Sequence, residues 1–130
     1  MSPSISVIMP AYNAERTIEL ALRSIRMQTI ADQIEILVID GGSTDATREI
    51  ARQYGAVILE NPHRLPEPAK LIGIQRAKGR YVVKQDTDEE LIDHRQLERR
   101  IEFFSRHPQV RCIVCDEQRP DLNGGISTHY

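Results

Sequence analysis

Short runs of aliphatic, often β-branched residues alternate with helical patterns along this chain of 130 residues. The strand-like runs cover residues 4–9, 34–39, 57–59, 80–84 and 110–115. Between them apolar residues recur at helical spacing, as Ile18, Leu22 and Ile25 do, which is the pattern of a helix with one buried face. Such alternation with short connections predicts a Rossmann-like α/β domain, in which helices cover both faces of a mostly parallel sheet.

The same patterns predict the helices and loops. Four helices are expected. The first covers residues 14–27, and the second runs from a cap at Ser43 or Thr44 to a left-handed end at Gly55. The third covers residues 69–78, and the fourth has Leu97, Ile101 and Phe104 on one face. Residues 61–68 carry three prolines, and because proline has no backbone N–H to donate, we expect a surface loop there. Residues 119–130 show no periodicity, so residues 1–116 are predicted to form the domain and residues 117–130 a loop or tail.

Charge and composition restrict the ligands that the chain can bind. Seventeen Lys and Arg against nineteen Asp and Glu give a net charge of -2, so no overall field attracts nucleic acid or an anionic membrane. The first residues lack a basic start with an apolar run, and no stretch approaches the roughly 20 apolar residues of a membrane span. We therefore expect a cytoplasmic chain without an integral membrane segment, in which local groups hold any anionic ligand.

Cys112 and Cys115 form a Cys-x-x-Cys sequence, which could indicate a redox pair or half of a zinc site. They lie inside the run 110–115, which is predicted to be a strand, and residues three apart on a strand point to opposite faces. No second cysteine pair exists to complete a metal site. We therefore assign no function to the two cysteines, and none to the four histidines, which share no spacing.

Chemically versatile residues follow three of the predicted strands. Pro10-Ala11-Tyr12 ends the first, Asp40 ends the second, and Asp86 and Asp88 follow the fourth. In open parallel sheets, ligands bind outside the carboxyl ends of the strands, near the point where strand order reverses. The sequence thus predicts an aromatic ring and three carboxylates along one rim.

These residue types suit a nucleoside diphosphate and a metal ion. An aromatic ring stacks on a nucleobase, and a carboxylate accepts hydrogen bonds from a base imide or from ribose hydroxyls. Asp86 and Asp88, one residue apart, can share a hard divalent cation that bridges phosphate oxygens. Each has a plainer alternative: the acid pair as a solvated turn, Asp40 as a cap on Gly41-Gly42, and Tyr12 as a ring packed on the sheet edge.

Other nucleotide and phosphate motifs are absent from the sequence. There is no Gly-x-Gly-x-x-Gly after the first strand and no Gly-Lys-Ser/Thr, which argues against dinucleotide oxidoreductases and P-loop enzymes. A haloacid-dehalogenase type of phosphoryl transfer also uses Asp-x-Asp after a strand. In that class the pair normally follows the first strand and a Thr or Val stands where this chain has Glu90, so this alternative is disfavoured.

Three ordered motifs resemble those of family 2 glycosyltransferases. They are Ser6-Val7-Ile8-Met9-Pro10-Ala11-Tyr12-Asn13, Val38-Ile39-Asp40-Gly41-Gly42-Ser43-Thr44-Asp45, and Ala77-Lys78-Gly79-Arg80-Tyr81 leading to Asp86-Thr87-Asp88. The resemblance covers about residues 4 to 116. It implies a GT-A fold, a donor sugar on a nucleoside diphosphate that is usually UDP or GDP, and transfer with inversion at the anomeric carbon.

The resemblance also implies roles for individual residues. Pro10, Ala11 and Tyr12 would line the base pocket, and Asp40 would hydrogen-bond the base. Asp86 would contact ribose or metal-bound water, and Asp88 would ligate Mg2+ or Mn2+. Lys70 would reach the base or phosphate, but the usual Ala-Arg-Asn-x-Gly stands here as Ala69-Lys70-Leu71-Ile72-Gly73, so Lys70 can equally be a lysine of the helix surface.

The residue that would remove the acceptor proton has no counterpart. Family domains are usually longer, and their later part supplies the acceptor site and a carboxylate base. Asp116, Glu117 and Asp121 have no spacing that identifies a base, so we nominate no catalytic residue. We expect either the donor domain of an enzyme, whose acceptor half would begin at residues 117–130, or a truncated, non-catalytic nucleotide-binding module. The acceptor and the oligomeric state stay open.

Overall fold

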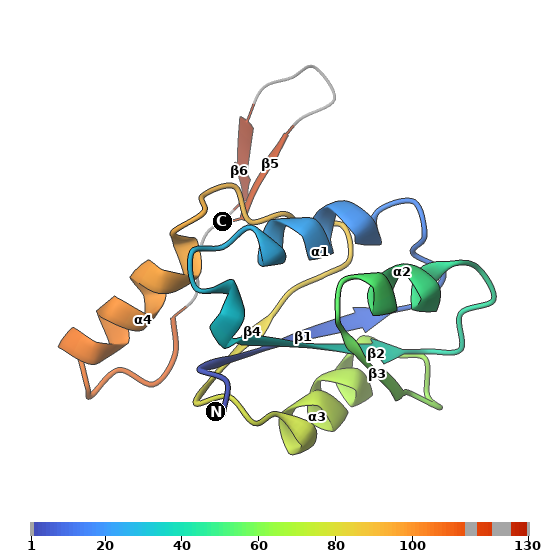
Figure 1. Cartoon of the computed structure of the whole chain (residues 1–130), viewed down its shortest axis with the longest axis horizontal. Coiled ribbons are helices and arrows are strands. Elements are labelled where there is room, and N and C mark those ends of the chain that lie inside the picture. Colours follow the sequence, from blue (N-terminus) through green and yellow to red (C-terminus); the bar gives the residue numbers. More distant parts are fainter. Residues whose placement is uncertain (1, 114–116, 121–125, 130) are drawn as a thin grey trace.

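The computed structural model describes residues 2–113, 117–120 and 126–129 of the chain. A parallel sheet forms its centre, with strand order β3-β2-β1-β4 (Figure 1). The strands are β1 (Ile5–Ala11), β2 (Ile34–Asp40), β3 (Val57–Glu60) and β4 (Tyr81–Lys84). The predicted parallel α/β sheet is therefore confirmed.

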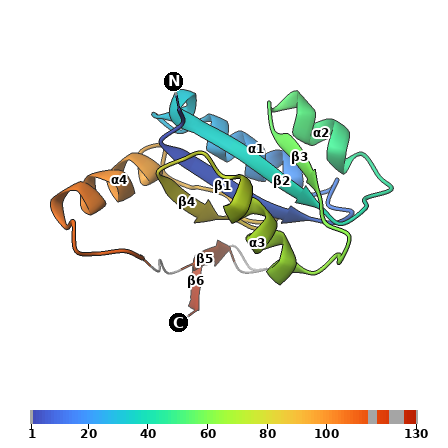
Figure 2. The ribbon, with the colours of Figure 1, turned by 90° about the horizontal axis from the view of Figure 1, so that it is seen from below.

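Helices cover both faces of this sheet, and one helix lies beside the edge strand β4. They are α1 (Ile18–Arg26), α2 (Thr47–Gln53), α3 (Pro66–Arg76) and α4 (Gln96–Arg106), with a short 3-10 turn, η1 (Ala31–Gln33), before β2. Figures 1 and 2 show α1 and α2 on one face and α3 on the other. None of the helices in the described part of the chain is long and apolar enough to cross a membrane.

The central strand β1 is buried on both faces because its side chains alternate between two cores. Val7 and Met9 pack in the larger core with the apolar face of α1, whereas Ile8 packs in the smaller core with Ala69 of α3. Strand β2 divides its side chains in the same way, with Val38 in the larger core and Leu37 in the smaller. The continuous apolar runs of these strands thus reflect burial on both faces.

Three helix starts differ from the prediction. Helix α2 begins at Thr47 with Ala46 as its cap, so the cap expected at Ser43 or Thr44 is wrong, because these two residues instead bond to Asn13 in the loop after β1. Helix α1 begins at Ile18, four residues later than expected, because Asn13 to Thr17 form the loop that follows β1. Helix α3 begins at Pro66, so the loop predicted over residues 61–68 is wrong for its last three positions. The first N–H groups of a helix have no partner inside the helix, and a proline there loses no hydrogen bond.

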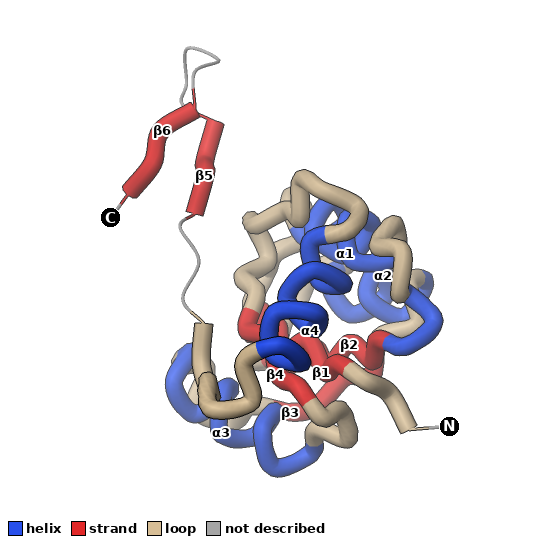
Figure 3. Tube along the Cα trace, turned by 90° about the vertical axis from the view of Figure 1, so that its left-hand side faces the viewer, coloured by secondary structure: helices blue, strands red, loops and turns tan. Residues whose placement is uncertain are grey.

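The C-terminal prediction also needs correction. Residues 110–113, expected to begin a strand, have no regular structure. The segment 117–130, predicted to be a loop or tail, instead contains β5 (Glu117–Pro120) paired antiparallel with β6 (Ile126–His129), apart from the main sheet in Figure 3. Backbone pairing in a short hairpin needs no apolar alternation, so the periodicity gave no signal. Cys112 is exposed, and Cys115 lies outside the described residues.

Strand order places a topological switch beside β1. The chain runs outward from β1 to β2 and β3, then returns to pair β4 with the other edge of β1. Loops that leave the carboxyl ends of β1 and β4 therefore diverge at this point, where open parallel sheets bind ligands. The fold supports the predicted location of the site.

Gly79 lets the turn between α3 and β4 approach the central strand. A Cβ at this position would lie 2.5 Å from the backbone nitrogen of Ser6 and 2.6 Å from the carbonyl carbon of Ile5. The Gly79 N–H donates to Ser6 Oγ at 2.8 Å. The helix expected over residues 69–78 ends earlier, at Arg76 with Ala77 as its cap, so Gly79 does not end the helix and is required by its close contact with β1.

Substituting Gly79 with Ala is expected to lower the free energy of unfolding by about 1–3 kcal/mol, because the added methyl group overpacks against backbone that cannot move aside. Gln75→Ala, on the exposed surface of α3, is the matched control and should change it by less than about 0.5 kcal/mol. Urea unfolding followed by circular dichroism measures both. A Gly79→Ala protein as stable as the wild type would contradict the steric explanation.

Candidate functional site

The carboxyl ends of the strands lie at one edge of the sheet. Ala11 pairs with Asp40, and Asp40 pairs with Glu60 on β3. On the other side of β1, the Gln85 N–H donates to the carbonyl of Ile8 at 3.0 Å, so the acidic turn after β4 starts beside the last residues of β1. The structure thus brings together at this edge the strand ends that carry the predicted site residues.

Reciprocal hydrogen bonds join the loops that follow β1 and β2. The Asn13 N–H donates to Ser43 Oγ at 2.9 Å, and the Thr44 N–H donates to Asn13 Oδ1 at 2.8 Å. The Ala14 N–H donates to Thr47 Oγ1 at 2.8 Å. Asn13 itself has a φ of 46°, a left-handed conformation that asparagine tolerates better than most residues. The two loops therefore form one connected wall.

The buried side chain of Asp40 holds the loop after β2 in this wall. Its side chain is fully buried, and one carboxylate oxygen accepts from the backbone N–H of Gly42 at 3.0 Å and of Ser43 at 2.9 Å. The other oxygen accepts from Ser43 Oγ at 2.5 Å. Gly42 has a φ of 94°, which glycine adopts without steric cost. Direct contact between Asp40 and a base stays a prediction, and it would require exchange of one of these partners.

Arg48 of α2 completes the environment of Asp40. Arg48 Nε lies 2.7 Å from Asp40 Oδ2, and Arg48 Nη1 lies 2.9 Å from Glu60 Oε1. Burial by itself raises the pKa of the Asp40 carboxyl, but the hydrogen bonds from Ser43, Arg48 and Gly42 together outweigh it and hold the pKa below its ordinary value. The carboxylate is therefore charged, and its charge is used to shape the loop.

Substituting Asp40 with Asn is expected to lower the free energy of unfolding at neutral pH by about 1.5–3 kcal/mol, because Arg48 loses its buried charged acceptor. Since the folded pKa of Asp40 is lowered, the stabilisation is complete above the ordinary value of 3.8 and is lost as the pH falls through the lowered pKa. Urea unfolding of wild type and Asp40→Asn from about pH 7 to about pH 3 should show the difference narrowing. A difference that stays constant with pH would contradict the charged state.

Tyr12 and Arg64 pair at the outer surface of the same wall. The Arg64 guanidinium carbon lies 4.3 Å from the centre of the Tyr12 ring, within the range of a cation–π contact. Arg64 Nε donates to the Gly41 carbonyl at 3.2 Å. Tyr12 as a whole residue is 42% exposed, so it is not packed away on the sheet edge.

Arg64 was missed from the sequence because nothing near it in the chain marks it. It lies in the connection between β3 and α3 and has a φ of 59°, an uncommon conformation for a residue with a side chain that often marks a functional position. A Cβ on Gly41 would lie 3.0 Å from Arg64 Cγ and 3.1 Å from its Cα. The absence of a side chain at Gly41 therefore makes room for Arg64. This contact can be recognised only in the folded structure.

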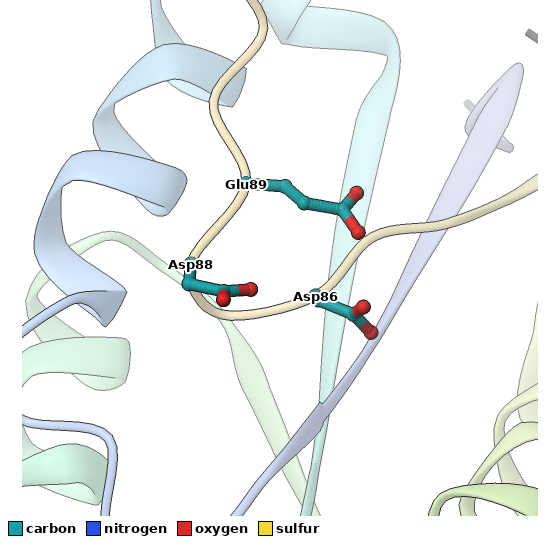
Figure 4. Close-up of side chains that lie close together, drawn as sticks. All are labelled: Asp86, Asp88 and Glu89. Atoms are coloured by element: carbon teal, nitrogen blue, oxygen red, sulfur yellow. The ribbon is translucent and has the colours of Figure 1, made fainter. Parts of the chain in front are cut away.

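Three carboxylates gather in the turn that follows β4. Asp86, Asp88 and Glu89 each offer one oxygen, and these oxygens lie within 4.8 Å of one another. Figure 4 shows the three side chains along the turn, with those of Asp88 and Glu89 on the inside of the bend. Glu89 was not predicted, because its return toward Asp86 depends on the turn, in which the Glu89 N–H donates to the Asp86 carbonyl at 3.2 Å.

Of the remaining predicted residues, Pro10 and Ala11 belong to β1 and Lys70 belongs to α3. Pro10 is half-buried and Ala11 is buried within β1, so both contribute mainly backbone. Lys70 of α3 pairs with Glu67 in its own helix at 3.3 Å, as a lysine of the helix surface does. Lys84 Nζ lies 2.7 Å from Asp86 Oδ1 and partly neutralises the acidic turn.

Comparison with known proteins identifies the chain's relatives. The family model described as "Glycosyl transferase family 2" matches residues 6–124. The chain belongs to glycosyl transferase family 2. The match confirms the family resemblance that the sequence motifs indicated. The likeness to solved structures confirms the GT-A type of α/β fold.

Three relatives show the extent of the match. The chain is 35% identical over 118 residues to the putative glycosyltransferase EpsE of Bacillus subtilis, covering 85% of this chain and 42% of EpsE. It is 27% identical to Staphylococcus aureus TarS 1-349 in complex with UDP-GlcNAc, with a TM-score of 0.72 over 80% of this chain and 32% of that one. It is 26% identical to the mannosyltransferase PcManGT of Pyrobaculum calidifontis in complex with GDP-Man and Mn2+, with a TM-score of 0.72 over 81% and 33%. The chain thus spans less than half the length of each.

Proposed function

We propose that this chain is the donor-binding part of an inverting family 2 glycosyltransferase, which holds a nucleoside diphosphate sugar through a divalent metal ion. The observation that carries the proposal is the convergence of the Asp86, Asp88 and Glu89 carboxylates at the sheet edge where Tyr12 lies. A metal held by these residues would lie at the same edge of the sheet as the loops that would hold the nucleoside. The acceptor and the group that removes its proton are not assigned to any residue of this chain.

The acidic turn fits Mg2+ or Mn2+. Both ions prefer oxygen ligands, and Mg2+ is usually held by one or two carboxylates together with substrate phosphates. Asp88 and Asp86 would hold the ion, with Glu89 close enough to add a third oxygen or orient a water. Lys84 would then give up its contact with Asp86. The bound metal would neutralise the diphosphate and make it a better leaving group.

The wall formed by the first two loops would hold the nucleoside. Tyr12 would stack on the base, next to the backbone of Pro10 and Ala11. Asp40 would keep the Gly41-Gly42-Ser43 loop in shape and could accept a base N–H after exchanging a partner. The Arg64 guanidinium, whose Nη groups have no hydrogen bond to other described residues, would donate to the base or to phosphate. Lys70 is the weaker basic candidate, because it is paired with Glu67.

The related structures support this assignment of ligand class. TarS was solved with UDP-GlcNAc, and PcManGT with GDP-Man and Mn2+. Both nucleotides present the diphosphate that the acidic turn would bind through a metal. We therefore propose UDP- or GDP-linked sugars as donors, without choosing between the two bases.

The metal role is tested with Asp88→Asn. Calorimetric titration of UDP and of GDP, with and without Mn2+, should show binding that Mn2+ strengthens in the wild type. In Asp88→Asn the Mn2+-dependent gain should fall about tenfold or more, or about 1.4 kcal/mol. Asp32→Asn, an exposed acid at the opposite end of β2, is the control and should bind as the wild type does. An undiminished Mn2+ effect in Asp88→Asn would rule out this role.

A transfer assay with UDP- and GDP-sugars then separates an enzyme from a binding module. Metal-dependent nucleotide binding without sugar transfer or hydrolysis would favour the module. Absence of nucleotide binding in the wild-type chain would contradict both functions.

Arg64→Met tests the nucleoside wall. Loss of the guanidinium removes a charged donor beside Tyr12, and we expect UDP affinity to fall about 5–15-fold, in line with about 1–1.5 kcal/mol for one hydrogen bond. Arg76→Met, in the exposed last turn of α3, controls for the loss of one positive charge. Equal, unchanged affinities in both variants would show that Arg64 serves only to support the loop.

A further inference from the structure

A buried glutamine lies between the edge of the sheet and the acidic turn. Gln85 directly follows β4 and precedes Asp86, and it is only 2% exposed. Its backbone N–H donates to the Ile8 carbonyl at 3.0 Å, which extends the pairing of β4 with β1 by one residue. The backbone of Gln85 is therefore fixed to the central strand at the point where the chain turns away to form the acidic turn.

The side chain of Gln85 closes that turn. Its Nε2 donates to the carbonyl of Glu89 at 2.9 Å, and inside the bridged segment the Glu89 N–H donates to the Asp86 carbonyl at 3.2 Å. Both the N–H and the carbonyl of Glu89 are thus tied to the start of the turn. The segment between Gln85 and Glu89 contains the two aspartates, so their backbone is held at both ends.

The other half of the Gln85 amide makes no such contribution. Gln85 Oε1 is buried and has no hydrogen-bond partner among the residues that the structure describes. A buried acceptor without a partner lowers stability, whereas an apolar side chain of similar size avoids that cost. Packing alone therefore does not favour glutamine here, and the hydrogen bond to Glu89 is the feature that an apolar residue could not supply.

We propose that Gln85 is a positioning residue for the metal site, which holds the backbone of the acidic turn so that the Asp86, Asp88 and Glu89 carboxylates converge. This inference rests on the proposed function. Gln85 would act by positioning the metal ligands, and none of its own atoms would bind the ion. Residues that contact the metal ligands, and not the metal itself, influence metal affinity strongly. Their loss typically weakens metal binding by about 10- to 100-fold.

The test is Gln85→Met. Methionine has a similar length and suits a buried position, but it removes the donor to Glu89 together with the unpaired acceptor. We expect Mn2+ affinity in the presence of UDP to fall about tenfold or more, measured by the electron paramagnetic resonance signal of free Mn2+. UDP affinity without metal should stay as in the wild type, and the thermal unfolding midpoint should shift by only a few degrees.

Gln75→Met, on the exposed surface of α3, is the matched control and should change neither Mn2+ affinity nor UDP affinity. A folded Gln85→Met protein with wild-type Mn2+ affinity would overturn the positioning role. So would a variant that unfolds, or that loses metal-free UDP binding in parallel with Mn2+ binding, because either result would make Gln85 a general structural residue. Failure of the proposed function is recognised separately, since the wild-type chain would then show no Mn2+-dependent binding of either UDP or GDP; if only GDP binds, GDP replaces UDP in the test of Gln85→Met.

Discussion

Strand β1 is the constraint on which the rest of the molecule depends. It pairs in parallel with β2 on one edge and with β4 on the other, and its side chains enter both cores. A slip of one residue in its register would exchange these two sets of side chains between the faces. The same register sets where along the sheet the loops with Tyr12, Asp40 and Asp86 begin. The strand pairing of β1 therefore determines both the packing of the core and the geometry of the site.

Charge is distributed unevenly around the site of a chain with a net charge of only -2. Arg48 is held by Asp40 and Glu60, and Lys84 by Asp86. Both cations therefore balance acids of the protein itself. Arg64 instead lies over an aromatic ring, where its charge is available to a ligand. The metal ion would supply the remaining positive charge that a diphosphate needs.

Much of this arrangement could be predicted from the sequence because it depends on local patterns. The strands β1 and β2 are continuous apolar runs, and the acids that follow β2 and β4 stand directly after them in the chain. Glu89, Arg64 and Gln85 escaped prediction for a shared reason. Each acquires its role through a contact formed only after folding: a turn, a cation–π pair between loops, or a hydrogen bond across the turn.

The errors at element boundaries have equally specific causes. Three prolines suggested an irregular segment, but two of them, Pro66 and Pro68, fall in the first turn of α3, where the missing N–H has no consequence. The hairpin of β5 and β6 has no apolar alternation to mark it. In both cases the backbone hydrogen bonds, and not the hydrophobic pattern, decide the structure.

The two halves of the proposed site follow different strands of the sheet. The nucleoside wall rises from β1 and β2, whereas the acidic turn follows β4. Neighbouring strands lie about 4.8 Å apart, so two strand spacings separate the Gly41 loop from the acidic turn by roughly 10 Å. A ligand that contacts both the Gly41 loop and the acidic turn must therefore reach across β1, as a nucleoside diphosphate with its base at one end and its phosphates at the other would do.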